Sequence, residues 1–224
     1  MNADEVAKYL FENPIFFEDH TELLTQLYLP NPHGGKAIAL ADRQVLALRE
    51  ENKALKTKMQ ELIQFGEEND AITGKMHRLV ISVLPVATLS ELLAELHYAL
   101  REGFAVPHTA LRIWSARNMP ALLSGDAADR EELNSVSDHV KDYASGLSRP
   151  FCGPSGNVEV ANWFGDPAAH VRSVAHIPLR DSAGACNGLL AMGSEDVLRF
   201  YPDMGIVYLQ RLGELTSAAL RRFV

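Results

Sequence analysis

The sequence has only two cysteines, and it lacks both an excess of positive charge and a long apolar run. Cys152 and Cys186 lie far apart, with no CxxC motif and no paired histidines nearby, so we expect neither a disulfide framework nor a metal site. The formal net charge of -8 gives no general attraction to nucleic acid or to anionic lipid. We therefore expect no direct binding to nucleic acid.

Two further absences concern membranes and secretion. No apolar run approaches the roughly 20 residues that span a bilayer. The first residues, MNADEVAKYLFENPIFF, are acidic and interrupted by Pro14, which does not fit the basic and then apolar order of a secretory signal. We expect a cytoplasmic protein that does not bind membranes.

The 224 residues divide into three predicted segments. Residues 1–35 predict a short helical segment, which ends in the proline- and glycine-rich run LPNPHGG. Residues 36–84 predict one long coiled-coil helix, and residues 86–224 predict a separate domain. Pro85 divides the last two, because the residue before a proline is disfavoured in a helix.

The long helix carries the heptad pattern of a dimerising coiled coil. Its a and d positions, with a slip in register after Leu62, are Val45, Leu48, Asn52, Leu55, Met59, Leu62, Asn69 and Met76. A buried asparagine at an a position pairs best with its equivalent on a parallel partner in register. Asn52 and Asn69 therefore favour a parallel homodimer, in which Glu51 at g faces Lys56 at e of the other chain. The alternative is a single helix that folds back against residues 1–35.

Residues 86–224 predict an α+β domain. Thr88 and Glu91 have the spacing of a capping box at the start of an amphipathic helix. The later predicted elements are a strand that contains Leu111 and Ile113, a helix near 130–143, strands at 171–179 and 186–194, and a helix at 203–223. The two late strands are joined by a short polar turn, which predicts an antiparallel hairpin. The expected architecture is an antiparallel sheet with helices on one face.

Several motifs in this domain resemble a known family. Ser173-x-x-x-Ile177-Pro178-Leu179, the run Gly188 to Ser194 and Asp196-x-x-x-Phe200 resemble the closing half of a GAF domain. With Gly34-Gly35, the run Arg43 to Asn52 and Asp203-Met204-Gly205, the chain resembles a bacterial family of GAF-like proteins called domain of unknown function 484. The resemblance covers nearly the whole chain. It implies a GAF-like fold and, by analogy with other GAF proteins, a sensory role without an assigned activity.

Strand alternation predicts a ligand pocket in the domain. Arg112, Trp114 and His176 are expected on the sheet face opposite Leu111 and Ile177. Segment 151–170 is expected to enclose that face around a small anionic or aromatic ligand, because arginine and histidine donate hydrogen bonds and tryptophan offers a stacking surface. The candidate ligand-binding residues are Arg112, Trp114, Phe151, Cys152, Trp163, His176 and Met192. The sequence indicates no particular cofactor.

We expect no catalytic residues. The lysine and acidic pair of cyclic-nucleotide-binding GAF domains are missing. GAF enzymes that reduce free methionine sulfoxide carry a cysteine shortly before the Ser-x-x-x-Pro-Leu segment, where this chain has Ala168, Ala169 and His170. The prediction is a non-enzymatic sensor or regulatory module that dimerises and acts in trans on an unidentified protein partner. Two alternatives stay open: a structural adaptor with a ligand-free GAF-like core, and a thiol-dependent methionine sulfoxide reductase-like enzyme.

Overall fold

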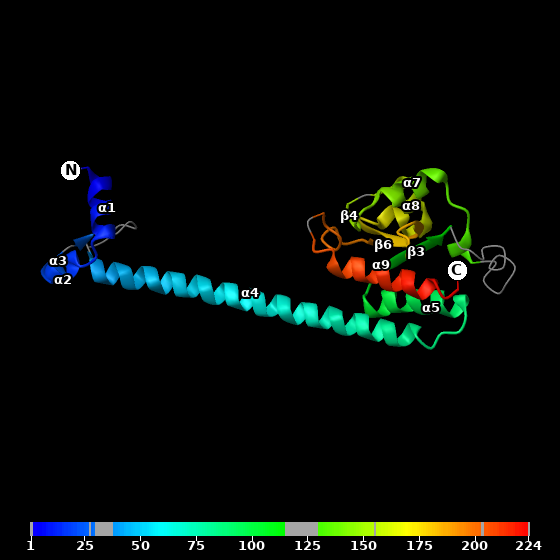
Figure 1. Ribbon diagram of the computed structural model, residues 1–224, viewed down its shortest axis with the longest axis horizontal. Helices are drawn as coiled ribbons and strands as arrows, with labels where there is room; N and C mark the ends of the chain where they lie inside the picture. The colour runs from blue at the N-terminus through cyan, green and yellow to red at the C-terminus, as the bar shows by residue number, and fades with distance from the viewer. Residues whose placement is uncertain are drawn as a thin grey trace. The chain divides into compact units, whose positions relative to one another are not determined.

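The computed structural model describes residues 2–26, 28–29, 38–114, 130–154, 156–202 and 204–223 (Figure 1). The chain divides into two compact units, Met1–Glu68 and Asn69–Val224. The helices of the described residues include none with the length and apolarity that a bilayer crossing requires.

The first unit begins with three short helices. They are α1 (Ala3–Glu12), α2 (Phe16–Asp19) and α3 (Thr21–Gln26). The backbone N–H of Asn2 donates to the Glu5 carboxylate over 2.8 Å, which satisfies a free donor at the start of α1. The short strands β1 (Tyr28–Leu29) and β2 (Ile38–Ala39) then pair antiparallel, a pairing that the sequence did not predict.

The predicted long helix is present as α4 (Leu40–Val83), which runs unbroken for 44 residues and ends two residues before Pro85. Its heptad positions differ between the two units. In the first unit the apolar positions from Val45 to Leu62 are exposed. In the second unit Leu79 and Val83 are buried in the core. Met76, which the heptad pattern assigned to the dimer seam, packs instead against this core.

The second unit contains a four-stranded antiparallel sheet. Its order is β3-β6-β5-β4, with bounds β3 (His108–Ile113), β4 (Phe151–Gly153), β5 (Ser173–Arg180) and β6 (Cys186–Ser194). The predicted hairpin is confirmed as β5 and β6, and the predicted strand around Leu111 is β3. Asp181 closes the hairpin turn, because its Oδ1 accepts from the backbone N–H groups of Ala183 and Ala185 over 2.8 and 2.9 Å. The α+β class is confirmed.

One face of this sheet packs against α5 (Leu89–Tyr98) and α9 (Val207–Leu220). The predicted capping box is present: the N–H of Glu91 donates to Thr88 Oγ1, and the N–H of Thr88 donates to the Glu91 carboxylate, both over 3.2 Å. Leu92 and Leu93 are fully buried in this first core. The expected cover by the two framing helices therefore holds for this face.

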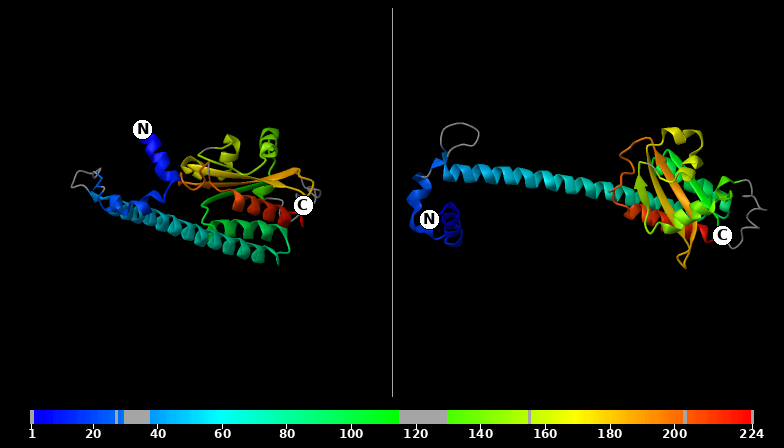
Figure 2. Two further views of the ribbon diagram at one scale, coloured as in Figure 1. Left: turned by 60° about the vertical axis from the view of Figure 1, so that its left-hand side comes forward. Right: turned by 90° about the horizontal axis from the view of Figure 1, so that it is seen from above.

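The opposite face is covered by short helices, so helices are not confined to one side of the sheet (Figure 2). These elements are α7 (Asp138–Gly146), α8 (Val158–Ala161), η3 (Asn162–Phe164) and η4 (Asp166–His170). The preceding turn η2 (Glu131–Leu133) contributes Leu133 to the first core instead. Val140 of α7 and Val160 of α8 are completely buried against this face, together with Leu189 and Ala191 of β6. A strand that is apolar on both faces needs cover on both, which explains the difference from the predicted one-sided arrangement.

The glycines of the second unit provide a test of this packing. A Cβ at Gly213 of α9 would lie 2.6 Å from Cγ2 of the buried Ile177, whereas a Cβ at Gly74 of α4 would meet nothing within 4 Å. Both sites are helical, where alanine is favoured over glycine by about 1 kcal/mol. We expect Gly213→Ala to lower the free energy of unfolding by about 1–3 kcal/mol, because the branched Ile177 side chain cannot yield freely.

The matched variant Gly74→Ala should raise the free energy of unfolding by up to about 1 kcal/mol. Urea denaturation followed by circular dichroism measures both changes. Equal shifts of the same sign in the two variants would contradict the close approach of α9 to β5.

Candidate functional site

The predicted polar face of the sheet has Arg112 and His176 on the same side. Arg112 pairs with Leu189 of β6, and His176 pairs with Ala191 two residues further along that strand. Leu189 and Ala191 are completely buried between them. The two polar side chains thus lie on strands separated by β6, and each has its own local surroundings. That this face binds a ligand stays a prediction.

Arg112 is only 9% exposed and already has protein partners. Its guanidinium carbon lies 5.2 Å from the ring centroid of Trp163, Nη1 donates to the Leu111 carbonyl over 3.0 Å, and Nη2 lies 3.6 Å from the Glu131 carboxylate. Burial lowers the pKa of Arg112, and the charges of Glu131 and Glu132 oppose that shift. The guanidinium stays charged because its ordinary pKa lies above about 12.

His176 is enclosed within the same face. It is 1% exposed, its Nδ1 lies 2.8 Å from the Tyr143 hydroxyl, and its ring centroid lies 5.8 Å from that of Phe151. A Cβ at Gly156 would overlap the imidazole, so the backbone there approaches the ring more closely than any other residue would allow. Burial lowers the pKa of His176 from its ordinary value of 6.5 to about 4, so the ring is neutral at pH 7.

The remaining candidate residues are divided between the two faces. Trp114, Phe151 and Trp163 pack against the second face, and the Trp114 Nε1–H donates to the Cys186 carbonyl over 3.1 Å. Cys152 and Met192 lie on the first face instead, because Ala175 of β5 pairs with both of them and directly paired residues share a side. The prediction that Met192 shares a face with Arg112 is therefore wrong.

The two cysteines have separate surroundings. Cys152 packs in the first core, and Cys186 packs against the second, on the opposite side of the sheet. Burial raises the pKa of the Cys152 thiol to about 11. Burial also raises the pKa of Cys186, although hydrogen bonds and the charge of Arg180 oppose it. Both thiols are protonated at pH 7, and a protonated thiol is a poor nucleophile.

A cleft of about 470 Å³ opens where the end of α5 approaches the start of β3. Its walls carry two histidines, the aromatic pair of η3, and Arg101 with Glu102, whose Nε and Oε1 atoms lie 3.6 Å apart. The lining residues are His97, Tyr98, Arg101, Glu102, Pro107, His108, Thr109, Trp163 and Phe164. Of these, only Trp163 was among the predicted ligand-binding residues. The cleft combines hydrogen-bond donors with an aromatic wall, which suits a small planar anion.

The backbone beside the cleft has an unusual conformation. The α5 helix continues into η1 (Ala99–Gly103), a π-helical turn in which the Phe104 N–H donates to the Ala99 carbonyl over 3.1 Å. Ala105 follows with a φ of 53°, a left-handed conformation that costs a residue with a Cβ about 1–3 kcal/mol. π-Turns and such strained residues both occur preferentially at functional sites. This turn places Arg101 at the cleft.

His97 is held on the cleft wall by a hydrogen-bonded network. Its Nε2 lies 3.0 Å from Oε1 of Glu132, and its Nδ1 lies 2.9 Å from Oγ1 of Thr109. Burial alone would raise the pKa of Glu132. The His97 hydrogen bond and the charges of His97 and Arg130 lower the pKa by more than burial raises it, so the net shift is downward. The carboxylate is therefore ionised at pH 7 and accepts a hydrogen bond from Nε2. Arg130 in turn donates to Ser90 Oγ over 2.6 Å.

His108 is the second imidazole of the cleft. Its Nε2 lies 3.8 Å from the Glu195 carboxylate, too far for a hydrogen bond. Nothing in the described part of the chain gathers three histidine, cysteine or acidic side chains in a way that would hold a metal ion. The imidazoles of His97 and His108 and the Arg101 guanidinium are the hydrogen-bond donors of the cleft, and each has a carboxylate within 4 Å.

Solved structures with a similar arrangement are GAF domains. One is the GAF domain of a Pseudomonas syringae pv. tomato protein described as a sensor histidine kinase, with 13% identity, a TM-score of 0.45, and coverage of 71% of this chain and 91% of that one. Another is the A. aeolicus nlh2 GAF domain in an inactive state, with 11% identity, a TM-score of 0.48, and coverage of 69% and 98%. Because both TM-scores lie below 0.5, we transfer no function from these proteins.

The family match extends over the whole chain. A family model described as "Protein of unknown function, DUF484" matches residues 1–224. The chain belongs to this family, as the sequence motifs predicted. A comparison with proteins of curated function found no match.

The burial of His176 predicts a pH dependence of stability. A histidine with a lowered pKa binds fewer protons in the folded than in the unfolded protein, so its contribution is complete above pH 6.5 and is lost as the pH falls toward 4. We expect this one group to lower the free energy of unfolding by up to about 1.4 kcal/mol per pH unit in that window. The His176→Gln variant should lose that slope.

Urea denaturation measures the slope directly when it is repeated between pH 7 and pH 4.5 in steps of about half a pH unit. His139→Gln is the matched control, because His139 is exposed on α7. Identical slopes for His176→Gln and for the wild-type protein would show that the His176 imidazole is not held neutral.

Proposed function

We propose that the protein is a ligand-responsive regulatory module, a parallel homodimer through α4 whose second unit binds a small planar anion. The observation that carries this proposal is the cleft of about 470 Å³ beside the π-turn. Its donors and aromatic wall serve recognition, and the two protonated thiols on opposite sides of the sheet favour this function over thiol catalysis. The protein acts in trans on another protein, and its mode of action is a shift between two states of the dimer.

The exposed seam of α4 supports the dimer. Val45, Leu48, Leu55, Met59 and Leu62 are between 46% and 67% exposed, although they are large and apolar. A row of such side chains at heptad spacing on one helix is typical of a coiled-coil interface.

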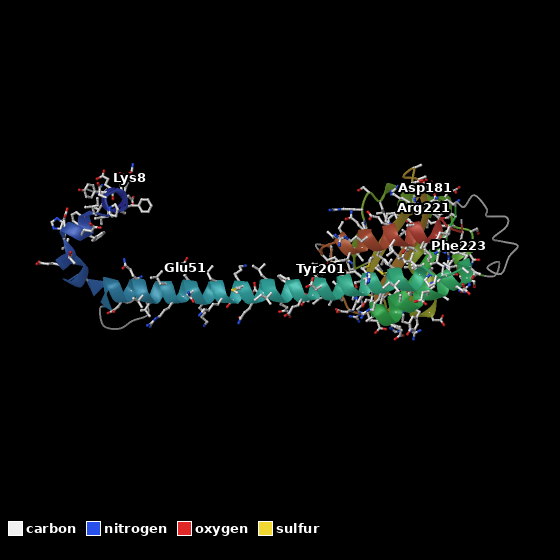
Figure 3. All side chains as sticks on the ribbon, turned by 60° about the horizontal axis from the view of Figure 1, so that its bottom comes forward. Lys8, Glu51, Asp181, Tyr201, Arg221 and Phe223 are labelled. Atoms are coloured by element: carbon white, nitrogen blue, oxygen red, sulfur yellow. The ribbon has the colours of Figure 1, made fainter. Side chains whose placement is uncertain are left out.

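Polar side chains along the seam define the orientation of the proposed dimer. Asn52 is at an a position, and Glu51, labelled on α4 in Figure 3, is at the preceding g position. In a parallel pair Glu51 of one chain faces Lys56 of the other, so the charges complement each other. Asn69 follows the slip in register, and its carbonyl accepts a hydrogen bond from the Tyr208 hydroxyl over 3.0 Å.

The dimer predicts a clear response to charge in the seam. Leu55→Glu together with Leu62→Glu should raise the dissociation constant of the dimer more than about a hundredfold, because two buried leucines are lost and carboxylates are placed opposite each other. Light scattering at micromolar protein concentration measures the mass. Ala54→Glu, at an exposed c position of the same helix, is the control and should remain a dimer. A monomeric wild-type protein would contradict the proposal.

The cleft predicts binding of a planar anion, for which benzoate is a simple probe. In a Trp114→Phe background Trp163 is the remaining tryptophan of the chain, so its fluorescence reports on the cleft wall. We expect benzoate to change this fluorescence in a saturable manner. Arg101→Gln should weaken binding about threefold to tenfold, because an exposed cation contributes less than a buried one.

Arg221→Gln is the control for the loss of one positive charge, since Arg221 is exposed at the end of α9. The absence of saturation at millimolar benzoate, or equal effects of the two arginine substitutions, would contradict an anion site in the cleft. A competing function as a structural adaptor would then be favoured.

A further inference from the structure

We propose that the second unit binds the alkyl chain of a medium-chain carboxylate in a second cavity, on the face of the sheet that carries Met192. This cavity of about 210 Å³ lies among α4, α9 and the segments that follow α5 and β6. It shares no lining residue with the cleft that contains Trp163. The proposal is therefore independent of the proposed anion site, and either one can fail without the other.

The walls of this cavity are apolar and deformable. Met76 of α4, Met192 of β6 and Met204 line it, and they are three of the six methionines in the chain. Unbranched thioether side chains adapt to ligands of variable shape, as they do in other adaptable binding surfaces. An apolar cavity of about 150 Å³ already binds a molecule the size of benzene, so this larger one has space for an alkyl chain.

The charged groups at the cavity are cationic. Lys75 of α4 and Arg199 line it, whereas the described lining residues include no carboxylate. The Arg199 guanidinium donates to the Phe104 carbonyl and lies 5.8 Å from the ring centroid of Phe200, which fixes its position. Lys75 is half-buried. An apolar chain with a single negative end group complements this arrangement, because the end group pairs with the cations while the chain contacts the methionines.

The volume of the cavity predicts the length of the alkyl chain that it accommodates. A methylene group occupies about the volume of a water molecule, roughly 30 Å³, so 210 Å³ accommodates about seven alkyl carbons, the number that octanoate carries beside its carboxylate. Octanoate is therefore the longest straight-chain carboxylate that should enter completely. Longer chains must leave their additional carbons in water, where they contribute nothing to affinity.

A bound chain would contact α4 and α9 together. Ile72 and Met76 line the cavity from α4, and Leu209 lines it from α9. Tyr208 of α9 is also part of the wall, and its hydroxyl lies 3.1 Å from Oγ1 of Thr73 on α4. The ligand would therefore stabilise the contact between these two helices.

A chain-length series tests the proposal on the full-length protein. Calorimetric titration with butanoate, hexanoate, octanoate and decanoate should show affinity rising about fourfold per methylene as far as octanoate and then levelling off. Octanol should bind more weakly than octanoate. Affinity that rises as steeply from octanoate to decanoate as it does before octanoate, or the absence of octanoate binding, would overturn the proposal.

The position of the ligand is tested with ¹³C-methyl-labelled methionine. Octanoate should shift the methyl signals of Met76, Met192 and Met204, whereas the exposed Met59 of α4 serves as the control and should not move. Lys75→Gln should weaken octanoate about tenfold and leave octanol unchanged, and Lys58→Gln on the same helix is its control. Shifts confined to Met59, or equal effects of the two lysine substitutions, would overturn the assignment.

Discussion

Burial of β6 on both faces is the constraint on which the second unit depends. Leu189 and Ala191 are completely buried on one face, and Leu190 and Met192 are 2% exposed on the other. A strand of this kind cannot form the water-exposed side of a sheet, so both faces need an apolar cover. The framing helices α5 and α9 supply one cover, and the short helices between β3 and β5 supply the other. The cleft lies beside the second cover, and the alkyl-sized cavity lies within the first.

The same constraint explains the state of the polar groups on the sheet. A buried polar side chain is stable only when its hydrogen-bonding groups find partners within the protein. Arg112 therefore contacts Trp163, Glu131 and a carbonyl, and His176 is neutral and pairs through Nδ1 with Tyr143. The Nε2 atom of His176 is the exception, because it is buried without a hydrogen-bond partner among the described residues. The polar groups that are available to a ligand lie at the rim of the sheet, where the strand β3 begins and solvent reaches the cleft.

Local signals in the sequence predicted much of the fold. The capping box at Thr88, the end of α4 before Pro85 and the polar turn between β5 and β6 each depend on a few neighbouring residues. The cleft could not be predicted in this way, because it depends on the π-turn at Ala99–Gly103 and on the left-handed Ala105, which no residue type in that run requires. The face on which Met192 lies depends on its pairing with Ala175 across the hairpin, and alternation along β3 and β5 alone does not determine that register.

The surroundings of α4 change along its length, and the heptad register of its sequence changes as well. The apolar heptad side chains from Val45 to Phe65 are exposed, whereas Leu79 and Val83, further along the helix, complete the core of the second unit. A heptad seam that continued without interruption would keep one face of the helix directed to one partner. The slip rotates the apolar stripe around the helix, so that in the proposed dimer the same element would contact a second chain in one part and its own domain in the other. A ligand that stabilised the contact of α4 with α9 would act on the part next to the slip, where a small rotation of the helix changes which side chains the seam presents.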